Sequence, residues 1–520
     1  MTMAGKETTA ARAANPCGAM FRGDLGRRSF CRALAAGAAG LWTAGISRRL
    51  LGEEVRDGVL YPAPAPAPTT PAPVFSWHAA VLERIPPLRH ARGLRWPLIA
   101  WEGFSTAPEE PDFYRQLLDR GLAQHIRLDS RQIETALAIQ RAGSPVIVLE
   151  GASGAFPADL AGEPEAWQHQ LDAGYRPRER VRPCPSIHTG WAKFAERLRD
   201  TLRQFRDRGV RIDAVWTDWE NDPLYGADRY EQARRCKRCR EIVPRKALAS
   251  NERFLEFTTQ KFYDLFGAYY AAPVLEFYPK CSVTNWLAQP STPEEPQPGW
   301  SGNRGHVQMP PLVTAWNPTA YGAASWVWKD RSSEDRRDQD HVDQVYMNLL
   351  LRQVSLAGSL GERWAPEKEL IPWVARWVSE PPEREFPVMS RARYREALRH
   401  HWLRGVAGMQ VFSPRQKGYE DMALLEVEDA VAVYDEMLEF REFLEGGEVL
   451  TREVPPPQDD GVVWSGLRLG DRALARLFRQ SPGAGTKMIR PWGDREFSLE
   501  APKEGATYLL KEDGQVKLMG

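Results

Sequence analysis

The chain has 520 residues, which is enough for one large domain and a smaller one. Lysine plus arginine and aspartate plus glutamate both number 69, so the formal net charge is +0 at pH 7. This balance argues against a nucleic-acid-binding protein, which normally carries a basic excess, and gives no reason to expect binding to an anionic membrane surface.

The first 75 residues are predicted to lie outside the fold. Residues 1–45 contain the pair Arg27-Arg28 and then an apolar stretch from Ala33 to Gly45, which is typical of a twin-arginine-type export signal. Residues 46–75 form a Pro/Ala-rich linker. This signal predicts an exported, periplasmic or extracellular protein. Because no apolar run is long enough to cross a bilayer, we also expect no stable membrane span in the mature protein.

Residues 76–446 alternate predicted strands and helices. The predicted strands cover residues 98–101, 124–128, 146–149, 212–217, 282–286, 312–316, 371–378 and 409–412. Predicted helices cover 112–120, 130–142, 191–205, 252–270, 342–356, 391–403 and 421–444, and 287–311 is a predicted loop. This alternation favours an α/β fold, a (β/α)₈ TIM barrel. A doubly wound sheet is the alternative, but no Gly-rich phosphate-binding motif follows the first strand.

Residues 447–520 have a different pattern. Short apolar runs at 462–469, 474–479 and 496–499, with a hairpin around 512–514, predict antiparallel strands. We expect a small β-rich C-terminal domain packed on the barrel.

Four cysteines follow the linker: Cys184, Cys236, Cys239 and Cys281. The Cys236-x-x-Cys239 spacing suits disulfide chemistry or a structural metal site, and the sequence leaves these readings and free thiols open. No HExxH spacing, Walker loop or GxSxG motif is present, so we expect no cofactor and no catalytic metal.

The most informative segment is Ile212–Pro223, in which an apolar strand runs into acidic residues. Asp218 and Glu220 follow this predicted fourth strand, at the end that forms the active-site face of a barrel. Alternation along a strand would point both side chains the same way. Two confined carboxyls resist ionising together, so one gains a raised pKa and can act as a general acid. Cleavage of a glycosidic bond needs such an acid.

This segment resembles the fourth-strand motif of chitinase-like and hyaluronidase-like glycoside hydrolases. Asp213, Asp218 and Glu220 match the first, third and fourth acids of the chitinase-like pattern, whereas Trp216 replaces the second. The Asp218-Trp219-Glu220 core also occurs in hyaluronidase-like sequences. The resemblance implies Glu220 as the acid/base and Asp218 as the residue that orients a substrate 2-acetamido nucleophile, with N-acetylhexosamine in the substrate.

Two alternatives stay open. Glu380 follows the predicted seventh strand and would be the nucleophile of an ordinary retaining glycosidase with Glu220 as the acid. A non-catalytic carbohydrate-binding barrel is the second alternative. Further candidates for contact with a carbohydrate substrate follow the predicted strands: Trp101, Glu102, Trp219, Asn285, Trp316 and Tyr321.

Overall fold

The computed structural model describes residues 77–100, 110–150, 188–217, 227–285, 312–321, 338–376, 387–412, 420–453, 461–480 and 485–519. The predicted export signal and linker lie outside these ranges. Within them, every helix is too short or too polar to span a bilayer.

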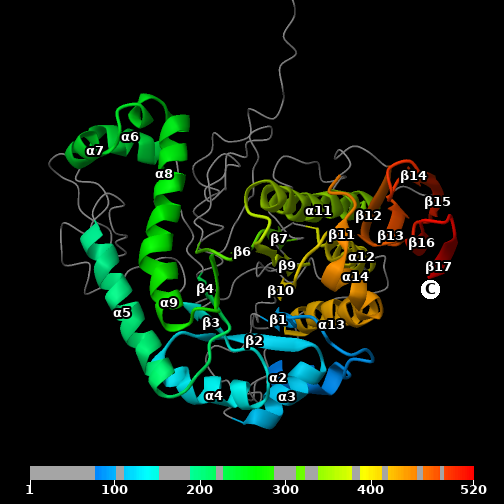
Figure 1. The fold of residues 1–520 in the computed structure, drawn as a ribbon, viewed down its shortest axis with the longest axis horizontal. Helices are drawn as coiled ribbons and strands as arrows, with labels where there is room; N and C mark the ends of the chain where they lie inside the picture. The colour runs from blue at the N-terminus through cyan, green and yellow to red at the C-terminus, as the bar shows by residue number, and fades with distance from the viewer. Residues whose placement is uncertain are drawn as a thin grey trace, which may run out of the picture. The chain divides into compact units, whose positions relative to one another are not determined.

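Parallel strands form the centre of the molecule (Figure 1). They are β1 (Leu98–Ala100), β2 (Leu122–Arg127), β3 (Ile147–Glu150), β4 (Ala214–Thr217), β5 (Ser282–Asn285), β6 (Ala315–Trp316), β7 (Thr319–Tyr321), β8 (Glu369–Leu370), β9 (Trp373–Ala375) and β10 (Gln410–Val411). One sheet has the order β5-β4-β3-β2-β1-β10-β9-β7, and β6 pairs with β8 in a second sheet.

The two sheets complete one barrel. Pro318 separates β6 from β7, and Pro372 separates β8 from β9, because proline has no N–H to donate to a ladder. Hydrogen bonds nevertheless continue between the β6–β7 segment and the β8–β9 segment, because Trp373 N donates to Pro318 O at 2.9 Å. Thr314 N donates to Val283 O at 2.9 Å and so joins β5 to the start of β6. Eight strand positions therefore close in sequence order, which confirms the predicted (β/α)₈ barrel.

Helices cover the outside of the strands. They include α2 (Trp77–Arg84), α3 (Pro111–Asp119), α4 (Ile133–Arg141), α5 (His188–Asp207), α8 (Asn251–Phe266), α9 (Ala272–Phe277), α11 (Gln339–Trp364), α12 (Arg391–Trp402), α13 (Glu420–Met437) and α14 (Arg441–Gly446). In α5 the apolar positions Trp191, Phe194, Leu198 and Phe205 are buried at helical spacing. The chain leaves this helix at Gly209, whose φ of 77° is easily reached only by glycine.

Two short helices were not predicted. These are α6 (Ala227–Arg235) and α7 (Lys237–Ile242), which precede α8. Their sequence is dominated by charged residues and lacks an apolar stripe at helical spacing. They fold because Ala233, Cys236, Cys239 and Val243 pack against Phe254 of α8, a contact that local periodicity does not reveal.

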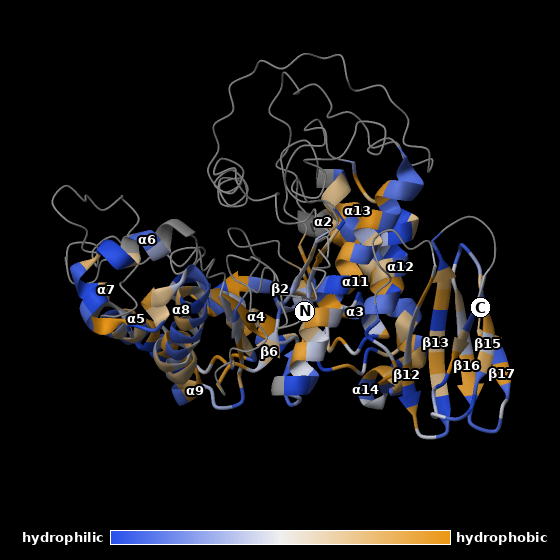
Figure 2. Ribbon diagram, turned by 90° about the horizontal axis from the view of Figure 1, so that it is seen from above, coloured by the Kyte–Doolittle hydropathy of each residue, from blue (hydrophilic) through white to orange (hydrophobic). Residues whose placement is uncertain are grey.

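The C-terminal part forms antiparallel sheets. Five strands are ordered β11 (Glu448–Val449), β12 (Val462–Leu469), β13 (Arg472–Arg479), β16 (Ala506–Lys511) and β17 (Val516–Met519). A hairpin of β14 (Gly485–Ile489) and β15 (Phe497–Ala501) packs on them through Ile489 and Leu499. Hydrophobic and hydrophilic residues mix along these strands (Figure 2). The prediction missed β11 and β14, which are short or largely polar.

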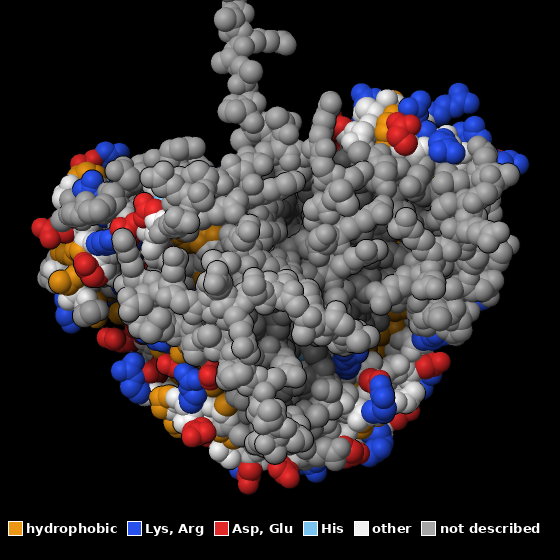
Figure 3. Space-filling model, turned by 180° about the vertical axis from the view of Figure 1, so that it is seen from behind, with side chains coloured by type: hydrophobic (Ala, Val, Ile, Leu, Met, Phe, Trp, Pro, Cys, Tyr) orange, Lys and Arg blue, Asp and Glu red, His pale blue; other side chains and the backbone are white. Residues whose placement is uncertain are grey.

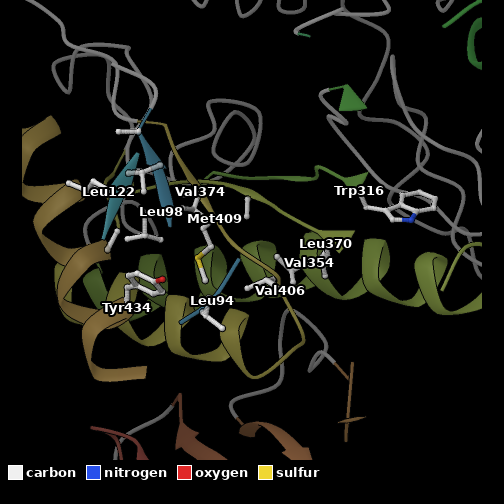
Figure 4. Close-up of a cluster of buried hydrophobic side chains, with 14 of the residues drawn as sticks. Leu94, Leu98, Leu122, Trp316, Val354, Leu370, Val374, Val406, Met409 and Tyr434 are labelled. Atoms are coloured by element: carbon white, nitrogen blue, oxygen red, sulfur yellow. The ribbon is translucent and has the colours of Figure 1, made fainter. Parts of the chain in front are cut away.

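Apolar side chains fill two separate spaces in the barrel. The larger cluster lies between strands and helices and includes Leu98, Leu122 and Tyr434 (Figure 4). A smaller cluster fills the interior of the barrel and includes Ile99, Ala123 and Ile147. Each strand thus contributes alternate residues to the inside and the outside.

Candidate active site

The predicted acids follow the fourth barrel strand. Asp218, Trp219 and Glu220 come directly after β4 and lie outside the described residues, as do Trp101, Glu102 and Glu380. The structure does describe the strand that leads to the acids, the barrel interior, and the candidates Asn285, Trp316 and Tyr321.

The alternation of β4 is clear. Ala214 and Trp216 belong to the interior cluster, whereas Val215 belongs to the outer cluster that packs against helices. The Trp216 ring lies 6.2 Å from that of Trp96, which enters the interior from before β1. Residues of even number on this strand therefore face the barrel axis.

Asp213 lies at the other end of the same strand. Its carboxylate accepts the backbone N–H of Val146 at 2.9 Å and pairs with Arg211 at 3.0 Å. These contacts hold the start of β4 beside the start of β3. The first acid of the motif therefore serves the N-terminal end of the barrel.

A layer of polar and aromatic side chains crosses the interior next to Trp216. The His125 ring of β2 stacks on Trp373 at 5.7 Å and meets Trp216 edge-on at 5.2 Å. Burial lowers the pKa of His125 to about 3, against the opposing effect of a hydrogen bond with Gln410. The imidazole is therefore neutral near pH 7.

A second pair continues this layer. The Thr284 hydroxyl lies 2.7 Å from Ala315 O and also contacts Asn317 Oδ1. Asn317 Nδ2 donates to Ile371 O at 2.7 Å. Buried polar groups are expected to find such partners, and here they link three neighbouring strands without any charge.

Aromatic rings lie at the C-terminal ends of the last strands. Tyr321 ends β7, and its ring stacks on Phe412 at 5.2 Å with 21° between the planes. Phe412 also contacts Trp373 edge-on at 6.2 Å. Among the described residues, Tyr321 is the predicted contact that lies beside this layer. Asn285 ends β5 and is partly exposed.

Trp316 has a different environment from the one predicted. It is 1% exposed and belongs to the outer apolar cluster, beside Leu370 (Figure 4). A Cβ at Gly361 of α11 would lie 3.5 Å from its indole nitrogen. Its neighbour on β6, Ala315, belongs to the interior cluster, so alternation turns Trp316 toward the helices. Its ring therefore has no open face for a sugar, which corrects the predicted substrate contact.

Sequence reasoning did not select His125, Trp373, Gln410 or Phe412. Each occupies one of the alternate positions of a barrel strand whose side chains face the interior. The interior cluster and the ring contacts of Trp373 identify these positions. The sequence signal that could have found them is the alternation of inward and outward positions along each strand. It becomes usable only when the strand bounds are known to within one residue.

The cysteines occupy separate clusters. Cys236 and Cys239 are buried among α6, α7 and α8, whereas Cys281 is buried before β5 in the outer barrel cluster. Burial raises the pKa of the Cys281 thiol, which is therefore neutral. Cys184 lies outside the described residues. Where the chain is described, no three His, Cys, Asp or Glu side chains are grouped to hold a metal ion.

No family model and no curated protein matches the chain. Solved structures with a similar fold include an endoxylanase of family GH30 from Clostridium papyrosolvens C71, which is 10% identical with a TM-score of 0.40 and covers 81% of this chain and 97% of its own. A β-galactosidase from Halorubrum lacusprofundi is 14% identical with a TM-score of 0.43, covering 68% and 59%. A GH42 β-galactosidase from G. stearothermophilus is 12% identical with a TM-score of 0.43, covering 68% and 58%. At these scores, the assignment to the (β/α)₈ barrels rests on the strand order and closure of this chain itself.

Proposed function

We propose that the chain is a glycoside hydrolase with Glu220 as its acid/base and Asp218 as its partner. The observation that carries the proposal is the alternation of β4, on which Ala214 and Trp216 face the barrel axis. Continuing that alternation for four residues would direct Asp218 and Glu220 to the same side, at the C-terminal mouth.

The interior below the mouth supports this assignment. Its polar layer contains the neutral side chain of His125 and the hydrogen-bonded pair of Thr284 and Asn317. Two carboxyls close together at the mouth would repel each other when both are ionised, and this repulsion raises the pKa of one of them. Glu220 would then protonate the leaving oxygen near neutral pH.

The finer proposal is substrate-assisted retention on N-acetylhexosamine residues, in a polysaccharide or glycoconjugate outside the cytoplasm. In this mechanism the substrate acetamido oxygen attacks the anomeric carbon, and Asp218 orients it. The export motif around Arg27-Arg28 supports the location. The alternative with Glu380 as the nucleophile would act on glycosides that lack an acetamido group.

The test is the turnover of 4-nitrophenyl N-acetyl-β-glucosaminide, chitin and hyaluronan by the purified protein. Glu220→Gln should lower kcat/KM by about 10²- to 10⁴-fold, because it removes the proton donor. Asp213→Asn, one residue before β4, is the matched control and should retain activity. Wild-type turnover by Glu220→Gln would remove this residue from the mechanism.

Two variants separate the mechanisms. Substrate-assisted retention predicts a large loss in Asp218→Asn and little loss in Glu380→Gln, whereas an enzyme nucleophile reverses that order. The anomer formed first, read by NMR, reports retention. Binding of a glycan with no turnover of any substrate would favour the non-catalytic carbohydrate-binding barrel.

A further inference from the structure

The helices α6 and α7, with the connection to α8, form an arm that we define as residues 230–246. The arm follows β4 in the chain, directly after the segment that holds the predicted acids. Helices α8 and α9, with the π-turn Gly267–Ala271 between them, cover residues 251–277 and lead to the start of β5. At 1.5 Å per residue they extend for about 40 Å.

The arm lies on the mouth side of the barrel. Strand β5 begins just after α9, so α9 lies at the N-terminal end of the strands. Helices α6 and α7 lie at the opposite end of α8 (Figure 1). A four-residue strand rises only about 13 Å, so α8 carries the arm beyond the C-terminal ends of the strands.

The arm has a basic surface on a chain with no net charge. Its exposed acidic residues are Glu231 and Glu241. Its exposed basic residues are Arg234, Arg235, Lys237, Arg240, Arg245 and Lys246. Figure 3 shows blue side chains gathered at the upper right, where the arm lies in that view.

Within the described part of the chain, most of these basic residues have no salt-bridge partner. Arg234 pairs with Glu231 at 3.4 Å. The other five exposed basic residues form no salt bridge with any residue that the structure describes. Many exposed arginines elsewhere are paired, for example Arg203 with Asp200 at 2.6 Å. The buried side chains of Cys236, Cys239 and Val243 hold the arm's backbone against α8, so the basic residues all extend from one anchored segment.

We propose that this arm binds an anionic polysaccharide chain and guides it to the barrel mouth. A flexible polymer with a charge on each sugar can contact several of these exposed cations at once, and binding gains free energy by releasing counterions. Two observations favour a glycan over a nucleic acid. The arm lies on the mouth side of the barrel, and the rest of the chain shows no basic excess. The inference rests on the proposed function and assigns its substrate class: a polymer that carries carboxylate or sulfate groups.

The test measures binding in the Glu220→Gln background, so that turnover plays no part. Affinity electrophoresis through polygalacturonate, dextran sulfate or neutral dextran compares the parent protein with the variant Arg235→Gln/Lys237→Gln/Arg240→Gln/Lys246→Gln. The matched control is Arg141→Gln/Lys280→Gln/Arg495→Gln/Lys517→Gln, which removes the same charge from exposed sites elsewhere. A smaller variant, Arg245→Gln/Lys246→Gln, lies outside the helices and tests the same surface if the first variant does not fold.

We expect salt-dependent retardation by at least one of the two charged polymers and none by neutral dextran. The arm variant should lose about tenfold or more in affinity, and the control less than about twofold. Equal losses in the arm and control variants would overturn the proposal, and so would tighter, arm-dependent binding of a 20-nucleotide single-stranded DNA. Absence of turnover in the wild-type enzyme would contradict the proposed hydrolase but leave this binding comparison intact.

Discussion

Two regions of the molecule bury different kinds of polar side chain. The barrel interior holds His125, Thr284, Asn317 and Gln410, which are all uncharged. The interface between α12 and the C-terminal sheet instead buries full charges. There Glu396 of α12 faces Arg476 of β13, with both side chains almost fully buried.

The ion pair at the interface is closely supported. Arg476 donates to both carboxylate oxygens of Glu396, at 2.7 and 2.6 Å. Burial alone would raise the pKa of Glu396, but Arg476 and then His400 hold it well below its usual range. His400 also contacts Ser465 at 2.8 Å, and Arg404 donates to the same hydroxyl at 2.8 Å.

The difference follows from the positions of the two regions. A charge in the interior would lie below the barrel mouth and would shift the pKa values of any acids there. At the interface a charge is remote from the mouth, and its paired geometry fixes how α12 meets the sheet. Under the proposed function, the uncharged side chains of His125, Thr284 and Asn317 suit a position below the catalytic acids. The ion pair of Glu396 and Arg476 instead fixes how α12 packs on the C-terminal sheet.

The largest effect is expected at the interface. Glu396→Gln should lower the free energy of unfolding by about 3–5 kcal/mol, because it leaves the Arg476 charge buried without its carboxylate. Urea unfolding measures this change. The matched control is Glu436→Gln, which removes the more exposed partner of Arg399 and should cost less than about 1 kcal/mol. Similar losses of unfolding free energy in the two variants would mean that the buried ion pair stabilises the protein no more than the exposed one.

Acid should destabilise the protein through its buried histidines. Burial lowers the pKa of His125 to about 3 and of His400 to about 4, below the value of about 6.5 in an unfolded chain. The unfolded state therefore takes up protons first. The stability contributed by neutral imidazoles is complete above about pH 6.5 and falls toward pH 4, by about 1.4 kcal/mol per pH unit for each histidine.

The variant His125→Gln sharpens this comparison. It should remove about 1.4 kcal/mol per pH unit from the slope of stability between pH 6 and 4.5, measured by urea unfolding at several pH values. The free energy of unfolding would then depend less on pH, and the remaining dependence would include the contribution of His400 at the interface. An unchanged slope would show that His125 does not stay neutral in the folded protein.

The smallest effect is expected from Thr284→Val. The shape is preserved, but Asn317 and Ala315 lose the hydroxyl that contacts them, which should cost about 1–3 kcal/mol. Thermal unfolding measures the change, and Thr314→Ser, which keeps its hydroxyl at the edge of the layer, is the control. A stabilised Thr284→Val protein would indicate that the interior needs no hydrogen bonds between its strands.

The sequence by itself determined the barrel. Alternating apolar runs and amphipathic helices located eight strand positions, and β12 was predicted with its observed bounds, Val462–Leu469. Local patterns suffice where a segment is long, periodic and buried on one face. The pairing of Asp218 with Glu220 was likewise a prediction from local spacing, and it remains one.

Only the tertiary structure decided which side chains face the interior. A shift of one residue in a strand exchanges the inside for the outside, and Trp316 shows the consequence, since its ring packs against α11. The same holds for α6 and α7, which depend on contacts with Phe254. The partnership of Glu396 with Arg476 joins residues 80 positions apart, and no local periodicity can predict a contact that folding alone creates.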